Sequence, residues 1–249
     1  PIQEIKEWIM NKLFYCMLLP LIAFGLCDKN SEKLVSSYSQ IQSCKNNYII
    51  WNDGTKMLYD DGKKKSFKEL LTSPDIEDTF HFEYPINFFP PPSFMNDPGR
   101  IRNDAFFKKL YGNNKDEVKS KLKSIKWLPS GKNILVTSVN DIDVKLSLIS
   151  KELKNLPLQF QKYVVNIGGA FKWRNIAGTS RLSTHSLGSS IDINVKYSAY
   201  WRWSKGKYLY KNKIPQEIVS IFEKYGFIWG GKWFHYDTMH FEYRPELLK

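Results

Sequence analysis

Two histidines and an aspartate are the side chains best suited to holding a metal ion. His185 and Asp192 stand seven residues apart in STHSLGSSID, where Gly188 lets the chain turn back so that both side chains aim at one point. His240 lies in the later stretch DTMHFEYRP, and Asp237 precedes it by three residues. Catalytic zinc in hydrolases takes three protein ligands and keeps a fourth position for water. The sequence therefore predicts a zinc site of His185, Asp192 and His240, with Asp237 as the base.

The Asp-x-x-His-Phe-Glu-Tyr pattern also occurs earlier, in DTFHFEYP, with Asp78 and His81. His81 has no ligand pair upstream, and it lies in a segment rich in proline and aromatic residues. A lone histidine is more often a core or surface residue than a ligand. We interpret the first copy as a coincidence and the second as the site.

The elements that must position these side chains are short. SIDINV alternates strictly, which points Asp192 away from the apolar face of Ile191 and Ile193. DTMHFEYR alternates too and sets His240 and Glu242 on the face opposite Phe241 and Tyr243. These two stretches predict strands that carry ligands on one face.

The remaining pattern predicts helices among short strands. Apolar spacing indicates helices within 139–157 and 214–226, a short helix at 104–111, and a hairpin followed by a short helix within 48–71. The stretch YVVNIGGAF, residues 163–171, is expected to be a strand that ends at its two glycines. We therefore predict an α+β fold with a small antiparallel sheet and flanking helices.

The N-terminus predicts export. Residues 13–27 form an unbroken apolar run that is short for a membrane span and typical of a signal peptide. Met10 is an alternative initiator, which would leave residues 1–9 untranslated, and AFGLC resembles a lipoprotein cleavage box ending at Cys27. The alternative is a buried N-terminal helix. We expect an exported protein of the cell envelope, periplasmic or lipid-anchored to a membrane.

The chain divides by composition into four segments. Residues 1–27 are the predicted export segment, 28–49 a polar tether with little to bury, 50–121 an N-terminal extension packing on the core, and 122–249 the domain with the zinc site. No disulfide framework is expected, because Cys16 would leave with the signal, Cys27 would be lipidated or lost, and Cys44 would stand alone.

Composition limits the partners. A chain of 249 residues with 42% hydrophobic and 25% charged residues is typical of a globular protein. The formal charge of +12 favours an anionic cell-wall or membrane surface, but the lysines are scattered rather than gathered in a stripe. We expect no nucleic-acid partner, and we expect a monomer.

Ser183-x-His185-x-x-Gly188-x-Ser190-x-Asp192, followed by WGGKWFHYDTMHFEYRPELL, resembles the D-alanyl-D-alanine carboxypeptidase and endolysin family of zinc peptidases. That family shares its core with lysostaphin and hedgehog-type domains. The resemblance covers residues 122–249. This sequence departs from the family in having Ser190 where alanine is usual and Asp237 where many members have glutamate.

The resemblance implies a role for each site residue. Zinc would be held by His185, Asp192 and His240, while Asp237 would take a proton from the attacking water and pass it to the leaving amine. An upstream arginine would stabilise the oxyanion or bind the substrate carboxylate; we favour Arg174 over Arg181. Ser183, Glu242 and Trp233 are predicted to support a ligand or to contact substrate, and His235 is a less favoured ligand candidate.

The predicted function is hydrolysis of peptide bonds in peptidoglycan stem peptides or cross-links by an exported zinc peptidase. Two alternatives stay open. One is a zinc-containing cell-wall binding module without catalysis, against which the presence of Asp237 argues. The other is a structural envelope lipoprotein that relies on basic charge and aromatic residues.

Overall fold

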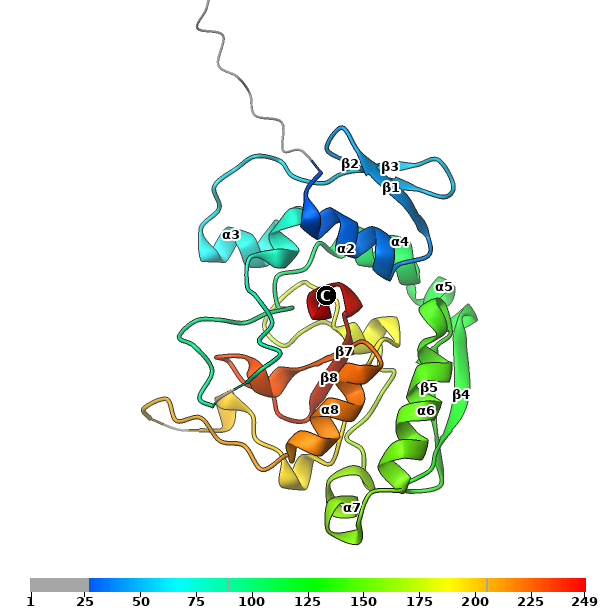
Figure 1. Ribbon diagram of the computed structural model, residues 1–249, viewed down its shortest axis with the longest axis vertical. Helices are drawn as coiled ribbons and strands as arrows, with labels where there is room; N and C mark the ends of the chain where they lie inside the picture. The colour runs from blue at the N-terminus through cyan, green and yellow to red at the C-terminus, as the bar shows by residue number, and fades with distance from the viewer. Residues whose placement is uncertain (1–26, 89, 205) are drawn as a thin grey trace, which may run out of the picture.

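The computed structural model describes residues 27–88, 90–204 and 206–249 (Figure 1). Of the predicted export segment, only Cys27 falls within these residues. The helices in the described part of the chain are all too short or too polar to span a bilayer.

The strands of the described residues form three small antiparallel sheets, and helices pack around them, so the predicted α+β class is confirmed. The strands, in sheet order, are β1 (Ile41–Lys45), β2 (Tyr48–Trp51) and β3 (Lys56–Leu58); β4 (Leu122–Trp127) and β5 (Lys132–Thr137); and β6 (Ser190–Asp192), β8 (His240–Tyr243) and β7 (Phe227–Trp229). The α-helices are α2 (Lys29–Ser37), α3 (Phe67–Thr72), α4 (Asp104–Tyr111), α5 (Lys115–Ser120), α6 (Ile142–Lys154), α7 (Leu158–Val164) and α8 (Gln216–Lys224).

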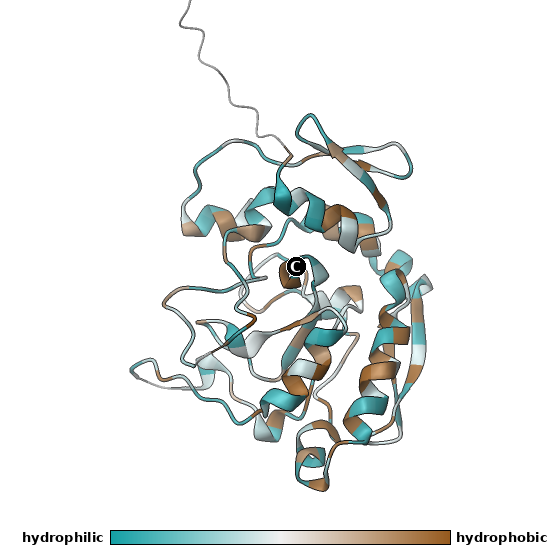
Figure 2. Cartoon of the chain, viewed as in Figure 1, coloured by the Kyte–Doolittle hydropathy of each residue, from teal (hydrophilic) through white to brown (hydrophobic). Residues whose placement is uncertain are grey.

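Helix α8 packs beside the sheet that contains β8, and α6 lies between α8 and the β4–β5 hairpin (Figure 1). Both helices carry apolar residues on the side that faces the core (Figure 2). Phe222 of α8 stacks on Phe241 of β8, with ring centroids 3.9 Å apart. The apolar face of β8 is thereby buried, so its opposite face is left for His240 and Glu242.

Residues 28–49 are not a tether, so that prediction is wrong. Asp28 caps α2 by accepting a hydrogen bond from the backbone N–H of Ser31, and the chain then enters β1 and β2. Leu34, Tyr38 and Ile41 are buried in the same hydrophobic core that holds the residues of α6 and β8. The apolar residues of this segment are few, but these three belong to a core whose other members lie mostly far away in the sequence.

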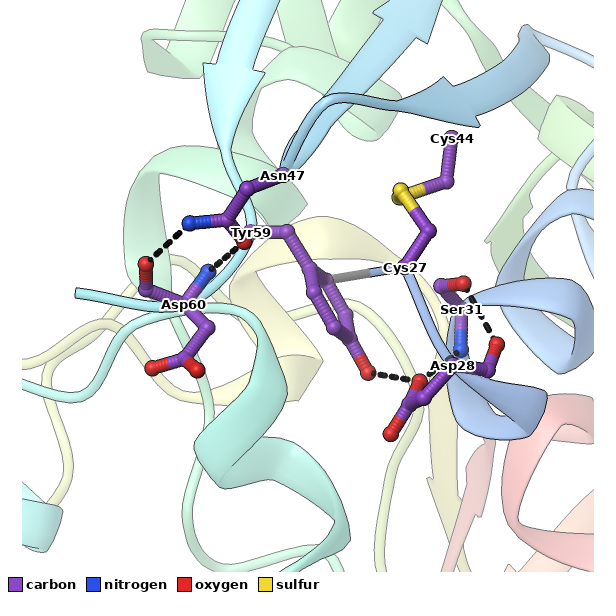
Figure 3. The surroundings of a disulfide bond; sticks show 7 residues. All are labelled: Cys27, Asp28, Ser31, Cys44, Asn47, Tyr59 and Asp60. Carbon is purple, nitrogen blue, oxygen red and sulfur yellow. Dashed lines mark hydrogen bonds between the residues drawn. A yellow bond between two sulfur atoms is a disulfide. The ribbon is translucent and has the colours of Figure 1, made fainter. Parts of the chain in front are cut away.

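Cys27 and Cys44 form a disulfide that joins the residue before α2 to β1 (Figure 3). Close to it, Tyr59 donates a hydrogen bond to Asp28. The prediction that Cys44 stands alone is therefore wrong. A sulfur atom in a disulfide cannot also carry a thioether-linked lipid, so this bond is incompatible with lipid attachment at Cys27.

The stretch 163–171 is not a strand, and that prediction is also wrong. Pro157 begins helix α7, which continues through Val164, because a proline fits at the start of a helix. The two glycines that follow lie against β6: the backbone N–H of Gly168 donates to the carbonyl of Asp192, and a Cβ on Gly168 would come within 2.8 Å of the Val195 side chain. The glycines thus allow close packing of a loop beside the ligand strand.

Candidate metal centre and active site

Strand pairing brings two of the predicted ligands together. Asp192 at the end of β6 lies directly opposite His240 at the start of β8 in the antiparallel register. Side chains of directly opposed residues lie on the same face of a sheet. Although 48 positions separate them in the chain, the His240 Nδ1 and Asp192 Oδ1 atoms are 3.0 Å apart.

The third ligand comes from a single turn of 3-10 helix, η3 (Thr184–Leu187), that leads into β6. Ser183 begins this turn, and its side chain accepts a hydrogen bond from the backbone N–H of His185. Gly188 ends the turn with a positive φ of 67°, where a Cβ would lie 2.9 Å from the backbone nitrogen of Thr137. Only glycine fits this close return, which turns His185 towards Asp192.

The three side chains form one cluster. His185 Nε2 lies 3.1 Å from Asp192 Oδ1, and one ligand atom from each of His185, Asp192 and His240 lies within 4.8 Å of the others. Burial opposes ionisation of Asp192, but hydrogen bonds from both histidines hold its pKa well below its usual range. Two imidazole nitrogens and a carboxylate oxygen are a donor set that zinc accepts, so these residues could hold the ion.

The nitrogens that point away from the cluster have their own partners. His185 Nδ1 is 2.6 Å from the carbonyl oxygen of Ala170, and His240 Nε2 is 3.1 Å from Glu242 Oε2. Burial alone would keep Glu242 protonated, but His240 and Arg244 lower its pKa to about 2. Acceptors of this kind fix the orientation of a ligand ring and raise its basicity.

Asp237 lies beside the cluster with one carboxylate oxygen unpaired. Its backbone forms a bridge with Tyr200 and donates to the carbonyl of Gly230, and a Cβ on Gly230 would come within 2.6 Å of the Asp237 carbonyl oxygen. Asp237 Oδ1 is buried, and none of the described residues makes a hydrogen bond to it. A buried polar atom without a partner is costly, so its presence beside the cluster requires an explanation.

We expect the activity of the protein to decline in acid with a midpoint at or below about pH 6. Burial, reinforced by the negative charge of Asp192, raises the pKa of Asp237 to about 6. Below its pKa this carboxyl is protonated and cannot accept a proton; a bound cation would only lower that pKa further. The pH dependence of kcat/KM measures the midpoint, and an acid limb well above pH 6 would contradict Asp237 as the base.

The two candidate arginines differ in exposure. The Arg174 side chain is exposed, while its backbone N–H is held 2.8 Å from the hydroxyl of Ser186, on the same turn as His185. Arg181 instead donates to the carbonyl oxygens of Arg100 and Arg102, and burial lowers its pKa to about 10. Arg174 is free to reach a substrate, whereas Arg181 fastens the N-terminal extension.

The other predicted residues surround the cluster. Trp233 is buried, and its ring centroid lies 5.7 Å from that of His240, so it supports the ligand rather than lining an open cleft. His235 has no ligand atom in the cluster and hydrogen-bonds to Asp97 instead. In the earlier copy of the motif, His81 is exposed and Asp78 is paired with Lys65 at 2.5 Å.

Sequence reasoning missed some residues that contact the cluster or its partner Glu242. Thr184 has its hydroxyl 3.5 Å from His240 Nε2, and Arg244 pairs with Glu242 at 3.1 Å. One signal was available for Arg244, since His240, Glu242 and Arg244 follow one another at a spacing of two and so share a face. Ala170 contacts His185 through its backbone carbonyl, which every residue has, so the residue type could not have predicted this contact.

Three clustered atoms that could bind a metal ion, beside a carboxylate with a free oxygen, fit the needs of a metal-dependent hydrolase. Residues 177–243 match the family model of D-alanyl-D-alanine carboxypeptidase, which confirms the resemblance seen in the sequence, and we call this stretch the peptidase segment after the family that it resembles. All three cluster residues and Asp237 fall within it. The chain matches no curated protein and no solved structure.

Proposed function

We propose that this protein is an exported zinc peptidase that hydrolyses peptide bonds in peptidoglycan stem peptides or cross-links. The observation that carries the proposal is the cluster of His185, Asp192 and His240 beside the buried, unpaired Oδ1 of Asp237, inside the stretch that matches the peptidase family. A binding module would have no use for that carboxylate, whose burial without a partner destabilises the fold.

In the proposed mechanism each residue has one task. A zinc ion held by His185, Asp192 and His240 would polarise the scissile carbonyl and acidify the attacking water. Asp237 accepts the proton of that water and then donates it to the leaving amine. Arg174, exposed beside the turn of His185, supplies positive charge to the oxyanion or to a substrate carboxylate.

Two features support export. Disulfides persist in oxidising compartments, and Cys27 is bonded to Cys44. The formal charge of +12 favours anionic cell-wall polymers. Because the disulfide occupies the Cys27 sulfur, the proposal is a secreted or periplasmic enzyme without a lipid on that residue.

Digestion of purified peptidoglycan tests the function. The protein is incubated with wall fragments after treatment with a chelator, and again after zinc is added back, and the products are identified by mass spectrometry. We expect zinc-dependent release of D-alanine or of peptides, and the masses distinguish carboxypeptidase from endopeptidase cleavage. Wall binding that survives the chelator without any product would instead favour the structural envelope protein.

A further inference from the structure

A short segment of the N-terminal extension runs across the loops that surround the site. We call residues 96–102, NDPGRIR, the strap. The backbone N–H of Phe234 donates to the carbonyl of Asn96 at 2.8 Å, and Arg181 donates to two further strap carbonyls. Gly99 lies so close to the C-terminal strands that a Cβ there would come within 2.5 Å of Ile228 and 3.3 Å of Glu242.

One strap side chain holds a histidine of the peptidase segment. Asp97 is fully buried, and its Oδ1 accepts the backbone N–H of His235 at 2.8 Å. Its other oxygen lies 2.6 Å from His235 Nδ1 and 2.8 Å from Arg100. A buried carboxylate that binds one imidazole nitrogen fixes the orientation of the ring, and with it the direction in which the other nitrogen points.

His235 stands next to the proposed base. It precedes Asp237 by two residues, and both lie along the segment of Tyr200 and Trp201: Tyr200 forms a bridge with Asp237, while the Trp201 ring lies 4.5 Å from that of His235. The ring of Tyr236, between them, packs against Tyr210. His235 lies in a turn, and Tyr236 is 1% exposed whereas His235 and Asp237 on either side of it are only partly buried, so both lie on the outer side of this turn.

The second ring nitrogen of His235, Nε2, is available for a further hydrogen bond. Among the described residues, none makes a hydrogen bond to His235 Nε2, and the side chain is 17% exposed. We propose that Asp97 and His235 form a composite dyad in which His235 Nε2 hydrogen-bonds to the main chain of the peptide substrate beside Asp237. This inference rests on the proposed function and assigns the strap, and with it the N-terminal extension, a part in the active site.

Two substitutions separate this role from a structural one. His235→Asn keeps an amide nitrogen where Nδ1 stood, so the bond to Asp97 survives while Nε2 is removed. His235→Gln places an amide group near the position of Nε2 and gives up the bond to Asp97. If the imidazole only fastened the strap, the asparagine variant would be the less damaged of the two.

We expect His235→Asn to lower kcat/KM by about tenfold to a hundredfold, the loss of one substrate hydrogen bond, and His235→Gln to retain more activity. Zinc content and melting temperature of the asparagine variant should equal those of the parent. Equal activities of the two variants, the reverse order, or loss of zinc by His235→Asn would overturn the proposal. His81→Asn, at the exposed histidine of the earlier motif copy, is the matched control and should behave as the parent.

A binding measurement keeps this test independent of catalysis. In an Asp237→Asn background, calorimetric titration with a purified stem peptide should give a Kd about tenfold higher when His235→Asn is added. An unchanged Kd would overturn the role of His235. A parent enzyme that binds the peptide but cleaves nothing would overturn the peptidase function and leave the binding role standing.

Discussion

Asp237→Asn is expected to lower kcat for wall-peptide hydrolysis by about a hundredfold to ten-thousandfold, the range for loss of a general base. Asparagine has nearly the same shape but cannot accept the proton of the attacking water. The ligands His185, Asp192 and His240 are untouched, so zinc content should remain that of the parent. Single-turnover rates on a defined stem peptide, together with zinc analysis of the same sample, measure both quantities.

The chain supplies its own control for that variant. Asp78 occupies the same place in the earlier copy of the motif, but it is paired with Lys65, so Asp78→Asn should cost stability and leave kcat unchanged. Asp237→Glu restores a carboxylate on a chain longer by one methylene and should recover part of the rate. An Asp237→Asn enzyme as active as the parent would remove Asp237 from the mechanism.

Sequence reasoning succeeded where a residue type and a local period gave the same answer. The alternation in SIDINV and DTMHFEYR predicted which face Asp192 and His240 occupy, and the observed register places them opposite each other. The return of His185 towards Asp192 follows from Gly188, whose positive φ and close packing require glycine. Spacing and turn chemistry were therefore sufficient to predict that these three side chains lie together.

Sequence reasoning failed where the contact is long-range. The stretch 28–49 looked like a tether because its few apolar residues are separated by polar ones, yet Tyr38 is buried and its hydroxyl bonds to Glu246, 208 positions away. The dyad of Asp97 and His235 joins residues 138 positions apart. Local periodicity gives no information on such partners. Polar side chains such as Asp97 and His235 are usually exposed to water, so the sequence around them does not show that they are buried against a distant partner.

The longest of these connections leads to a ligand. Arg244 is 1% exposed, and its guanidinium donates to Glu246 at 2.6 Å and to Glu242 at 3.1 Å. Glu246 accepts the hydroxyl of Tyr38 from the N-terminal helix region, while Glu242 contacts His240. One buried cation thus links the N-terminal residues to the candidate metal centre.

We therefore expect Arg244→Met to lower the free energy of unfolding by about 3–5 kcal/mol, because Glu242 and Glu246 would stay buried without their cation. Loss of the cation would raise the pKa of buried Glu242 and so favour its protonated form, which cannot accept a hydrogen bond from His240, and zinc affinity should fall by about tenfold to a hundredfold. Urea unfolding and zinc titration measure the two effects.

The control is Arg174→Met, at an exposed arginine, which should show the opposite profile of parental stability and reduced kcat/KM. Adding Glu246→Gln to Arg244→Met should recover part of the stability, since it removes one of the unpaired charges. If Arg244→Met unfolded like the parent, the buried ion network would have no part in joining the N-terminal residues to the site.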